Sequence, residues 1–586
     1  MKKLIHISIV LIMGLVFTGC QDILNQPPSD AIDLDEFFSS PNDLKVATND
    51  LYSILPGKEV YTRDASSDNI LRETIASRIK GSRITPTSKG SGGWSWGKLR
   101  RVNFVLENYD QVDNAEAKSK YSGIAKFFRA YFYFQKVKRF GDVPWYNKVL
   151  EVGDEELYKP RDSRELVMDS VLSDINYAID NIPAEKELLK VTKYTALILK
   201  ARLALFEGTF RKYHDLKGYE KFLKAAVKAS ETLINSGAYT LFTDGGPDQS
   251  YRELFARNEQ DMTETILAAQ FNKSNRRHDL AYRMTSSTLG YWGFTKDLIN
   301  SYLMEDGSRF TDQPDYKTMG FFEEMQDRDP RLTQTTAGPD FVVRGEDSPE
   351  PIDLDITKTG YRVIKALPTR DQWGSGASIN DVIIFRYAEA LLIYGEAKAE
   401  LGILTQSDLD KSINKLRDRV DMPHLDMAYA NANPDSYQEN LYPNVDQGPN
   451  KGIILEIRRE RRIEMVNEGL RWGDLMRWKE GKKVEQPMLG IYFPGLGAYD
   501  FDNDGSPDVY VHDGDDSGAP DAVTSKIDID ARPLRDPITG ETGGTSGNLD
   551  PFLQRGSFQE PKDYLYPIPK QDLKLNENLE QNPGWE

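Results

Sequence analysis

The chain contains almost no cysteine. Cys20 is the only one among its 586 residues. Because no thiol follows position 20, a disulfide framework, a zinc-thiolate site and a cysteine nucleophile are all excluded for the folded part. Histidine is nearly as scarce, and we expect those beyond the first residues to be ordinary surface or packing residues, because they show no metal-ligand spacing: His214, His278, His424 and His512.

The chain also lacks a net positive charge and, beyond its N-terminus, any long apolar run. The 92 acidic and 74 basic residues give a formal net charge of −18. Such a charge repels nucleic acid and anionic lipid headgroups, so nucleic acid is excluded as an expected partner. Beyond the N-terminus no segment is apolar enough to span a bilayer, so membrane contact is expected through an attached lipid only. The 39% of hydrophobic residues can still bury a sizeable core.

The N-terminal segment predicts export and lipid attachment. A basic start at Lys2 and an apolar run from Leu4 to Phe17 precede Cys20. This order is typical of a secretory signal, and a run of about 15 residues is too short to cross a bilayer. We therefore predict a lipoprotein signal peptide at residues 1–19, fatty acylation of Cys20 and a lipidated tether at residues 20–34. A cleaved signal followed by a buried free thiol is the alternative.

Helical periodicity dominates the remaining chain. Residues 35–586 are expected to form one domain, mostly α, with helical repeats at about 42–236 and later helices at 381–468. Small residues such as Ala226 and Ala229 alternate with large ones, as in tetratricopeptide helices, where they let paired helices approach closely. We predict a tetratricopeptide-like scaffold of helical pairs, with individual helices near residues 42–55, 96–109, 116–139, 163–182, 192–210, 219–236, 381–402, 408–419 and 452–468.

Three stretches between these helices differ in composition. Residues 56–95, 240–380 and 485–565 are rich in Gly, Pro, Asp and Ser. Long irregular loops can carry exposed aromatic and polar groups without disturbing packed helices. We expect the ligand-binding surface on these three stretches, which we call the excursions.

Several short motifs, weak singly but specific in their order and spacing, carry a resemblance to a known family. They are residues 126–133 (KFFRAYFY), 139–144 (RFGDVP), 386–390 (RYAEA), 396–397 (EA), 460–464 (ERRIE), 468–478 (EGLRWGDLMRW), 566–569 (YPIP) and 581–584 (QNPG). Together they run nearly end to end. On these residues the chain resembles the SusD/RagB family of nutrient-binding outer-membrane lipoproteins.

The resemblance implies a function and a location. It implies a surface-exposed lipoprotein of a Gram-negative outer membrane, facing the exterior, that captures oligosaccharide and delivers it to a SusC-type TonB-dependent transporter. It implies a receptor and not an enzyme. Because the ligand surface of this family varies with substrate, the resemblance transfers no ligand-contacting residue to this chain. The same fold binding peptides or another nutrient is the alternative, and a surface hydrolase is less favoured.

Two patterns suggest catalysis but are better explained by structure. Gly93-Trp94-Ser95-Trp96-Gly97 fits the Gly-x-Ser-x-Gly pattern of a nucleophile elbow, yet the preceding residues are polar and flexible where the elbow needs a buried strand. The charged residues between Glu460 and Arg477 could suggest acid-base chemistry. We interpret them as a scaffold network in which Arg461 and Glu464, three apart on a helix, can pair.

An acidic turn predicts a structural calcium site. Calcium prefers six to eight hard oxygen ligands, and acidic side chains at alternate positions around a glycine match the EF-hand loop up to its ninth position. The twelfth position is Val511 instead of Glu, so a closing ligand would have to come from elsewhere, and a solvated acidic turn is the alternative. The candidate ligands are Asp500, Asp502, Asp504, Ser506 and Asp508.

Aromatic side chains in the excursions are the candidate sugar-binding residues. A flat apolar ring matches the C–H face of a pyranose, and nearby polar side chains can bond the hydroxyls. The expected exposed rings are Trp94, Tyr291, Trp292 and Trp373, and the expected polar contacts are Asp68, Asn69 and Arg72. Trp96, Trp472 and Trp478 fall at or within helical patterns and are expected to pack in the core.

Overall fold

The structure, a computed structural model, describes residues 38–445 and 448–586. The predicted signal peptide, the lipidation site Cys20 and the tether lie outside the described residues. Helices make up 41% and strands 9%, which confirms a mostly α fold. In the part of the chain that the structure describes, no helix is both long and apolar enough to cross a membrane.

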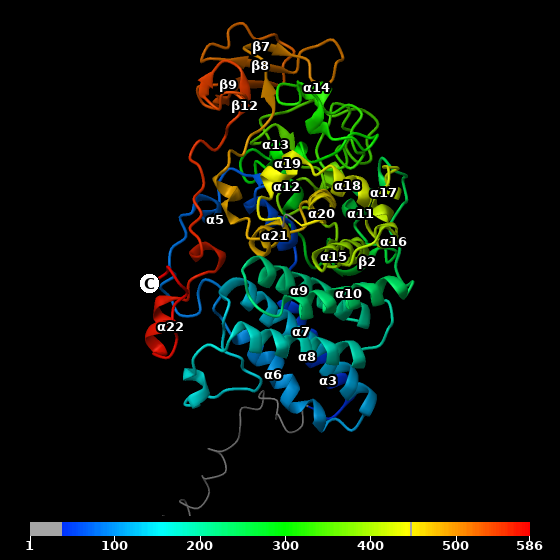
Figure 1. Cartoon of the computed structure of the whole chain (residues 1–586), viewed down its shortest axis with the longest axis vertical. Helices are drawn as coiled ribbons and strands as arrows, with labels where there is room; N and C mark the ends of the chain where they lie inside the picture. Colours follow the sequence, from blue (N-terminus) through cyan, green and yellow to red (C-terminus); the bar gives the residue numbers. More distant parts are fainter. Residues whose placement is uncertain (1–37, 446–447) are drawn as a thin grey trace, which may run out of the picture.

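Stacked helical pairs fill one end of the molecule (Figure 1). Helix α7 packs on α8, α8 on α9, and α9 on α10. The predicted close approach of paired helices is visible at Gly208 in α9, where an added Cβ would lie 2.8 Å from the Leu223 side chain of α10. The helices of this scaffold are α3 (Pro41–Asp50), α6 (Gly97–Asn108), α7 (Ala115–Phe140), α8 (Arg164–Asn181), α9 (Lys193–Tyr213) and α10 (Tyr219–Asn235).

A second group of helices packs on this scaffold through α15 (Tyr387–Glu400), which contacts α9, α10 and α20. The sequence predicted a helix from residue 381, but Val382–Arg386 form strand β5. The helix predicted at 408–419 is divided at Ser412 into two short helices. The other members are α16 (Gln406–Lys411), α17 (Ile413–Asp418), α18 (Met427–Ala432), α19 (Ser436–Leu441), α20 (Lys451–Glu464) and α21 (Arg471–Arg477).

The excursions fold into short strands and single helical turns. Strands β1 (Ile70–Leu71), β3 (Gly293–Phe294) and β4 (Tyr361–Arg362) form one antiparallel sheet, which joins the first excursion to the second. Strand β2 (Thr265–Ala269) pairs antiparallel with β5. The short helices of the excursions are α4 (Glu59–Thr62), α5 (Ser77–Lys80), α11 (Ser250–Ala256), α12 (Leu280–Thr285), α13 (Lys296–Ile299) and α14 (Phe321–Glu324). A further short helix, α22 (Lys570–Leu575), follows the third excursion.

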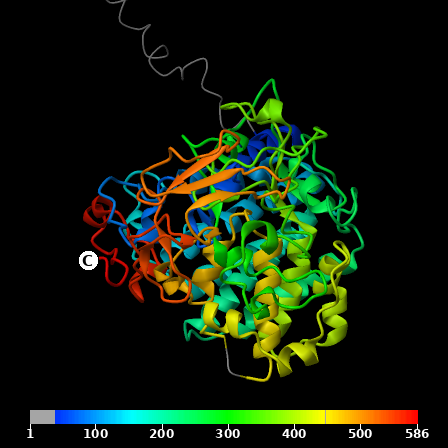
Figure 2. The ribbon, with the colours of Figure 1, turned by 90° about the horizontal axis from the view of Figure 1, so that it is seen from above.

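The third excursion forms two small sheets at the end of the molecule opposite the helical scaffold. In one of them β7 (Gly497–Tyr499) runs antiparallel to β8 (Val509–His512), and β8 runs parallel to β9 (Ser525–Asp528). Figure 2 shows this region lying over the rest of the fold when viewed from above. The second sheet has the order β11-β10-β12-β6, with bounds Thr542–Gly544, Leu534–Arg535, Gly547–Leu549 and Tyr492–Phe493.

The described chain begins at the end of the molecule that the helical scaffold forms. Phe38 is buried against Leu44, Val112 and Ala117 of the scaffold. The two sheets of the third excursion lie at the far end of the long axis (Figure 1). The first described residues and the third excursion therefore lie at opposite ends of the molecule.

Buried ion pairs connect α20 and α21 to their neighbours. Glu464 is fully buried and lies 2.7 Å from both Arg386 and Arg419. Arg461 pairs with Asp474 at 2.9 Å. The interpretation of this cluster as a scaffold network is supported by its burial, whereas the predicted Arg461–Glu464 pair is wrong because the two side chains face different partners.

Candidate ligand-binding surface

Two of the four aromatic candidates are core residues. Trp94 is 2% exposed and Trp292 is 1% exposed, so the expectation that they present free rings was wrong. The Trp94 ring packs edge-on against Phe140 at 4.9 Å and against Trp96 at 5.5 Å. Trp292 immediately precedes β3 and belongs to the main hydrophobic core. The glycine-rich flanks of these two residues suggested exposure. Both indole rings are buried instead, because removing their large apolar surface from water is favourable.

Asp68 and Asn69 belong to the buried polar network and not to a ligand surface. Asp68 accepts hydrogen bonds from both Nε and Nη2 of Arg471, at 2.7 and 2.6 Å. Burial alone would raise the pKa of Asp68, but Arg471 and Arg462 hold it well below the usual range. Asn69 Oδ1 accepts from Arg462 Nε at 2.8 Å. Their predicted role as sugar contacts was wrong because arginines of α20 and α21 already bind both side chains.

Tyr291, Trp373 and Arg72 are partly exposed. Trp373 lies beside two guanidinium groups, with the Arg370 and Arg362 carbons 4.7 and 5.2 Å from its ring centre. Arg72 has a buried Nε without a hydrogen-bond partner, and burial lowers its pKa. Tyr291 has a φ of 53°, a left-handed conformation that bulky residues rarely adopt and that occurs preferentially at functional sites.

Tyr291 lines a pocket where the three excursions meet. This Tyr291 pocket has a volume of about 190 Å³ and takes its walls from the second and third excursions. Lys358 lies over the Tyr291 ring at 5.2 Å and pairs with Glu73 of the first excursion at 3.1 Å. The lining residues are Tyr291, Lys358, Ala531, Arg532, Pro533, Asp550, Pro551 and Leu553.

The charged groups of the Tyr291 pocket are held in place. Asp550 is fully buried and pairs with Arg535 at 2.7 Å and with Arg555 at 2.6 Å. Arg532 donates to the carbonyls of Leu354 and Thr357. Its partners are carbonyls, so its charge is not cancelled by these contacts. A ring, two cations and a fixed carboxylate are thus brought together from segments up to 260 positions apart in numbering, a proximity that the sequence did not predict.

A separate hollow of about 380 Å³ lies between α6 and α22. It is mainly apolar, with Leu99, Tyr146, Leu575 and Trp96 in its lining, and one edge of Trp94 reaches it. Trp96 is only partly buried, whereas Trp478 is fully buried as predicted. Polar side chains also line this hollow, namely Lys89, Arg100, Asn103, Lys148, Asp572 and Asn576. Unlike the Tyr291 pocket, its described lining takes no residue from the second or third excursion.

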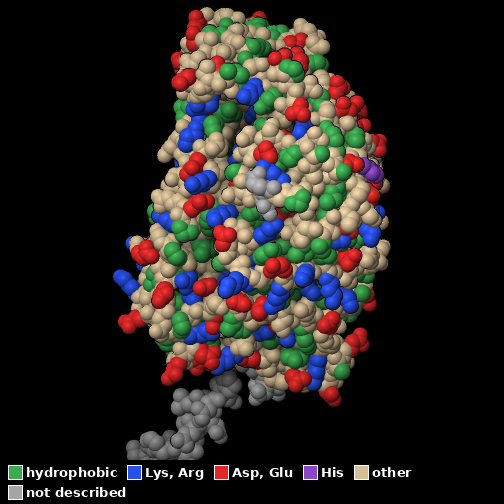
Figure 3. Space-filling model, viewed as in Figure 1, with side chains coloured by type: hydrophobic (Ala, Val, Ile, Leu, Met, Phe, Trp, Pro, Cys, Tyr) green, Lys and Arg blue, Asp and Glu red, His purple; other side chains and the backbone are tan. Residues whose placement is uncertain are grey.

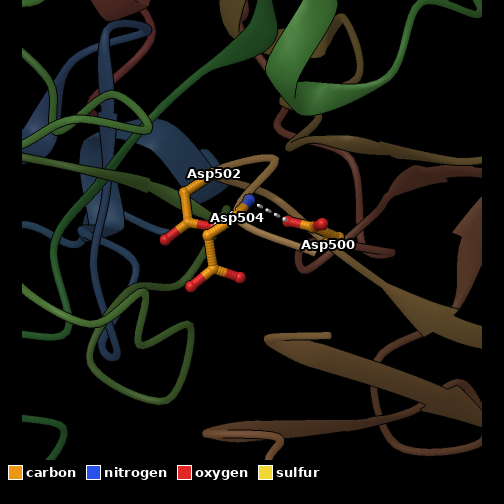
Figure 4. Close-up of side chains that lie close together, drawn as sticks. All are labelled: Asp500, Asp502 and Asp504. Carbon is orange, nitrogen blue, oxygen red and sulfur yellow. Dashed lines mark hydrogen bonds between the residues drawn. The ribbon is translucent and has the colours of Figure 1, made fainter. Parts of the chain in front are cut away.

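The acidic turn brings three of its predicted calcium ligands together (Figure 4). Carboxylate oxygens of Asp500, Asp502 and Asp504 lie within 4.8 Å of one another. Backbone N–H groups already shape the turn, because Gly505 N donates to Asp500 at 2.8 Å and Ser506 N donates to Asp504 at 2.7 Å. This donor set fits a hard cation, which would require further oxygens from carbonyls or water.

The remaining positions of this turn contribute less. Asp508 accepts from Phe501 N at 2.7 Å, which directs one of its carboxylate oxygens to the backbone. Burial, with Asp502 and Asp500 nearby, raises the pKa of Asp508. Val511 is buried in β8 and cannot supply a closing ligand. The calcium site therefore stays a prediction for Asp500, Asp502, Asp504, Ser506 and Asp508.

Ser95 lies in a setting unlike a nucleophile elbow. It follows a run of turns and precedes α6, with no strand before it. The Ser95 carbonyl accepts from Lys136 Nζ at 2.6 Å. Among residues 38–445 and 448–586, no histidine or carboxylate bonds its hydroxyl, so the geometry gives no support to the serine hydrolase alternative.

The chain belongs to the SusD family, whose model matches residues 253–585. A second family model, described as starch-binding associating with outer membrane, matches residues 58–205. Together these matches cover α6, α7, α8 and most of α9 of the scaffold, most of the excursions and the C-terminal segments. The resemblance drawn from the short motifs is confirmed.

Individual relatives agree with this assignment. A SusD-like protein of Formosa agariphila is 25% identical over 525 residues, covering 84% of this chain and 95% of the relative. Another SusD-like protein of the same organism is 24% identical over 511 residues, covering 83% of this chain and 93% of the relative.

Solved structures share the fold. A SusD-like protein of Bacteroides fragilis superposes with a TM-score of 0.68 at 22% identity, covering 95% of this chain and all of the other. A SusD-like carbohydrate-binding protein of the same species gives a TM-score of 0.67 at 21% identity, covering 93% and 100%. The predicted scaffold of helical pairs with long excursions is confirmed as SusD-like.

Proposed function

We infer that the protein captures a glycan at the Tyr291 pocket and passes it to a SusC-type TonB-dependent transporter in the outer membrane. The family assignment supports this proposal, as do the words starch-binding and carbohydrate-binding in the descriptions of the second family model and of a structural neighbour. The observation that carries the site is the meeting of all three excursions around one partly exposed aromatic ring.

The geometry suits a sugar. The Tyr291 ring can stack on the C–H face of a pyranose, while Lys358 and Arg532 offer donors to hydroxyl oxygens. The pocket volume of about 190 Å³ is smaller than the roughly 300–1,000 Å³ of typical ligand sites. It would therefore hold one end or one unit of a longer oligosaccharide, with the remainder lying along the excursion surface.

The position of the pocket fits the proposed orientation. Phe38 places the start of the described chain at the scaffold end, and the sheets of the third excursion occupy the other end (Figure 1). A lipid on Cys20 would hold the scaffold near the outer membrane, with the excursions turned towards ligand. In the SusD-like arrangement proposed here, the transporter lies against the helical side.

The alternative is the same fold binding a peptide or another nutrient. Tyrosine and basic side chains can also contact peptides, so the Tyr291 pocket by itself does not separate these ligand classes. Figure 3 shows acidic and basic side chains interspersed over one face of the molecule, which gives no preference for a strongly charged macromolecule. The family descriptions favour carbohydrate.

A glycan screen with pocket variants tests the proposal. We expect the mature protein to bind at least one polysaccharide or its oligosaccharides in affinity electrophoresis and calorimetry. Tyr291→Ala should weaken that binding about tenfold or more, because truncating an aromatic anchor costs on the order of 2 kcal/mol. The matched control is Tyr429→Ala, which removes a tyrosine that is 67% exposed on α18, outside the pocket.

The control should leave affinity unchanged, and neither variant should lose more than a few degrees of melting temperature. Binding that survives Tyr291→Ala would move the glycan to another surface. If no glycan of the panel binds but peptides do, the result would favour the alternative, the same fold binding a peptide.

We also propose that the acidic turn binds calcium as a structural ion. Titration calorimetry of the mature protein after chelator treatment should show calcium binding with a Kd of about 10⁻⁴–10⁻³ M, the range of extracellular calcium modules. The double variant Asp502→Asn, Asp504→Asn should weaken it at least about tenfold, whereas Asp347→Asn, in a different exposed turn, should not. A titration of the mature protein that shows no heat of calcium binding would contradict the proposed calcium site.

A further inference from the structure

A basic pocket lies where α7 and α21 face the C-terminal segment around Tyr566. Its volume is about 560 Å³. Although the chain is acidic, with a net charge of −18, every charged side chain among the described residues lining this pocket is a cation. The cations are Arg63, Arg78, Lys98, Lys136, Lys138 and Arg139.

Backbone carbonyls, not carboxylates, position most of these cations. Lys136 is 5% exposed and donates to the carbonyls of Gly93 and Ser95, both at 2.6 Å. Arg139 Nε donates to the Gly92 carbonyl at 2.6 Å. Arg78 likewise donates to two carbonyls, at 2.7 and 2.8 Å. Neutral acceptors fix the direction of each side chain without cancelling its charge.

Within the described residues, Lys138 lacks the ion pairs that the charged groups around it form. Arg202 pairs with Glu389 at 2.6 Å, and Asp474 is shared by Arg461 and Arg477 at 2.9 Å each. Within the described residues Lys138 has no carboxylate at ion-pairing distance, and its Nζ lies instead 5.1 Å from the Phe206 ring centre. A partly buried ammonium without a counterion is costly and would be stabilised by an anion entering the pocket.

We propose that this basic pocket binds the anionic substituent of a glycan, a sulfate ester or a uronate carboxylate. The proposal rests on the glycan-binding function inferred above and narrows the class of ligand. Arginine forks match the planar carboxylate and the oxygens of a sulfate, and lysines supply point charges. The anion would sit between α7 and α21, with Arg63 and Lys138 contributing cations that have no carboxylate partner among the described residues.

The remaining lining suits a sugar that carries the anion. Trp472, Tyr131, Phe132 and Tyr566 also line the pocket and provide ring surface beside the cations. Arg78 lies 4.6 Å from the Trp472 ring centre and Arg139 lies 3.8 Å from that of Tyr566, so these two guanidinium groups stack on aromatic faces. A pocket with both charge and ring surface favours an anionic sugar over a free inorganic ion.

Binding is expected to depend on pH. Burial lowers the pKa of Lys138 to about 7, and Arg63 and Arg202 act in the same direction. Asp474 opposes this shift but is neutralised by Arg461 and Arg477. Burial also lowers the pKa of Lys136 in the same pocket to about 7, with Arg139 acting in the same direction and Asp572 opposing it. Both ammonium groups gain charge as pH falls through 7, so anion affinity should be about tenfold higher at pH 6 than at pH 8 for each proton coupled to binding.

Calorimetry with the mature protein tests the inference. The probes are sodium sulfate, sodium glucuronate, and a sulfated oligosaccharide with its chemically desulfated counterpart, all at constant ionic strength. We expect the sulfated or uronate-bearing form to bind at least about tenfold more tightly than its uncharged counterpart. Lys138→Met and Arg63→Gln should each remove most of this difference, whereas Lys224→Met, on the exposed side of α10, should not.

A thermal readout separates binding from folding. Lys138→Met removes no ion pair within the described chain, so its melting temperature should equal or exceed that of the original protein. No preference for anionic probes, or a preference that survives both pocket variants, would overturn the inference. If neutral glycans bind and no anionic probe is preferred, the proposed glycan-binding function stands and the anion-binding inference fails. If sulfate binds at the basic pocket but no glycan binds, an anion site is supported and the glycan-binding function is contradicted.

Discussion

Replacing Glu464 by glutamine is expected to lower the free energy of unfolding by about 3–5 kcal/mol, because removing one charge of a buried pair leaves its partners uncompensated. Glu464 is fully buried and contacts Arg331, Arg386 and Arg419 at 3.3, 2.7 and 2.7 Å. Burial would raise the pKa of Glu464, but Arg419 and the other arginines hold it well below the usual range. Chemical denaturation of the two proteins at neutral pH measures the difference.

The matched control is a surface carboxylate. Glu151 pairs with Arg100 at 2.8 Å, but its side chain is 71% exposed, so Glu151→Gln should cost about 0–1 kcal/mol. Glycan affinity of Glu464→Gln, measured where the variant is folded, should stay close to that of the original protein. A stable Glu464→Gln variant that no longer binds glycan would contradict the assignment of this cluster to the scaffold.

Truncating Trp292 to alanine should destabilise the protein by about 3–5 kcal/mol, because it would leave a large cavity in the core. Trp292 is 1% exposed and adjoins the sheet that connects the first two excursions. Trp373→Ala should cost clearly less, since that ring is only partly buried. Equilibrium unfolding of both variants tests the distinction.

A conservative variant separates packing from ligand contact at the same position. The Trp292 Nε1 is buried without a hydrogen-bond partner, so Trp292→Phe loses volume but no hydrogen bond and should be tolerated far better than alanine. Glycan affinity should be unchanged by Trp292→Phe. A Trp292→Ala protein with normal stability and lost glycan binding would restore the idea that this indole contacts ligand.

Much of the scaffold could be predicted from the sequence because its signals are local. The predicted start of a helix at Ser163 holds, since the Ser163 hydroxyl accepts from Leu166 N at 3.2 Å. Small residues at the contacts between helices predicted that the helices pack closely in pairs. The error at residues 382–386 has a simple cause, because a fully buried strand and a buried helix present the same apolar run.

The binding surface was harder to predict because it depends on contacts between distant segments. Loop composition predicted an exposed ring at Tyr291, and the structure leaves this ring partly exposed. The same signal failed for Trp94 and Trp292, whose burial follows from tertiary packing. Asp68 and Asn69 were misassigned for the same reason, since their arginine partners lie some 400 positions later. Lys358 and Arg532 carry no local signal that marks them as neighbours of Tyr291.

The most direct test of glycan capture by the excursions is a crystal structure of the mature protein with the oligosaccharide that binds best. We expect a sugar ring stacked on Tyr291, within hydrogen-bonding distance of Lys358 or Arg532. An oligosaccharide bound to the helical scaffold alone, with the Tyr291 pocket empty, would contradict glycan capture by the excursions.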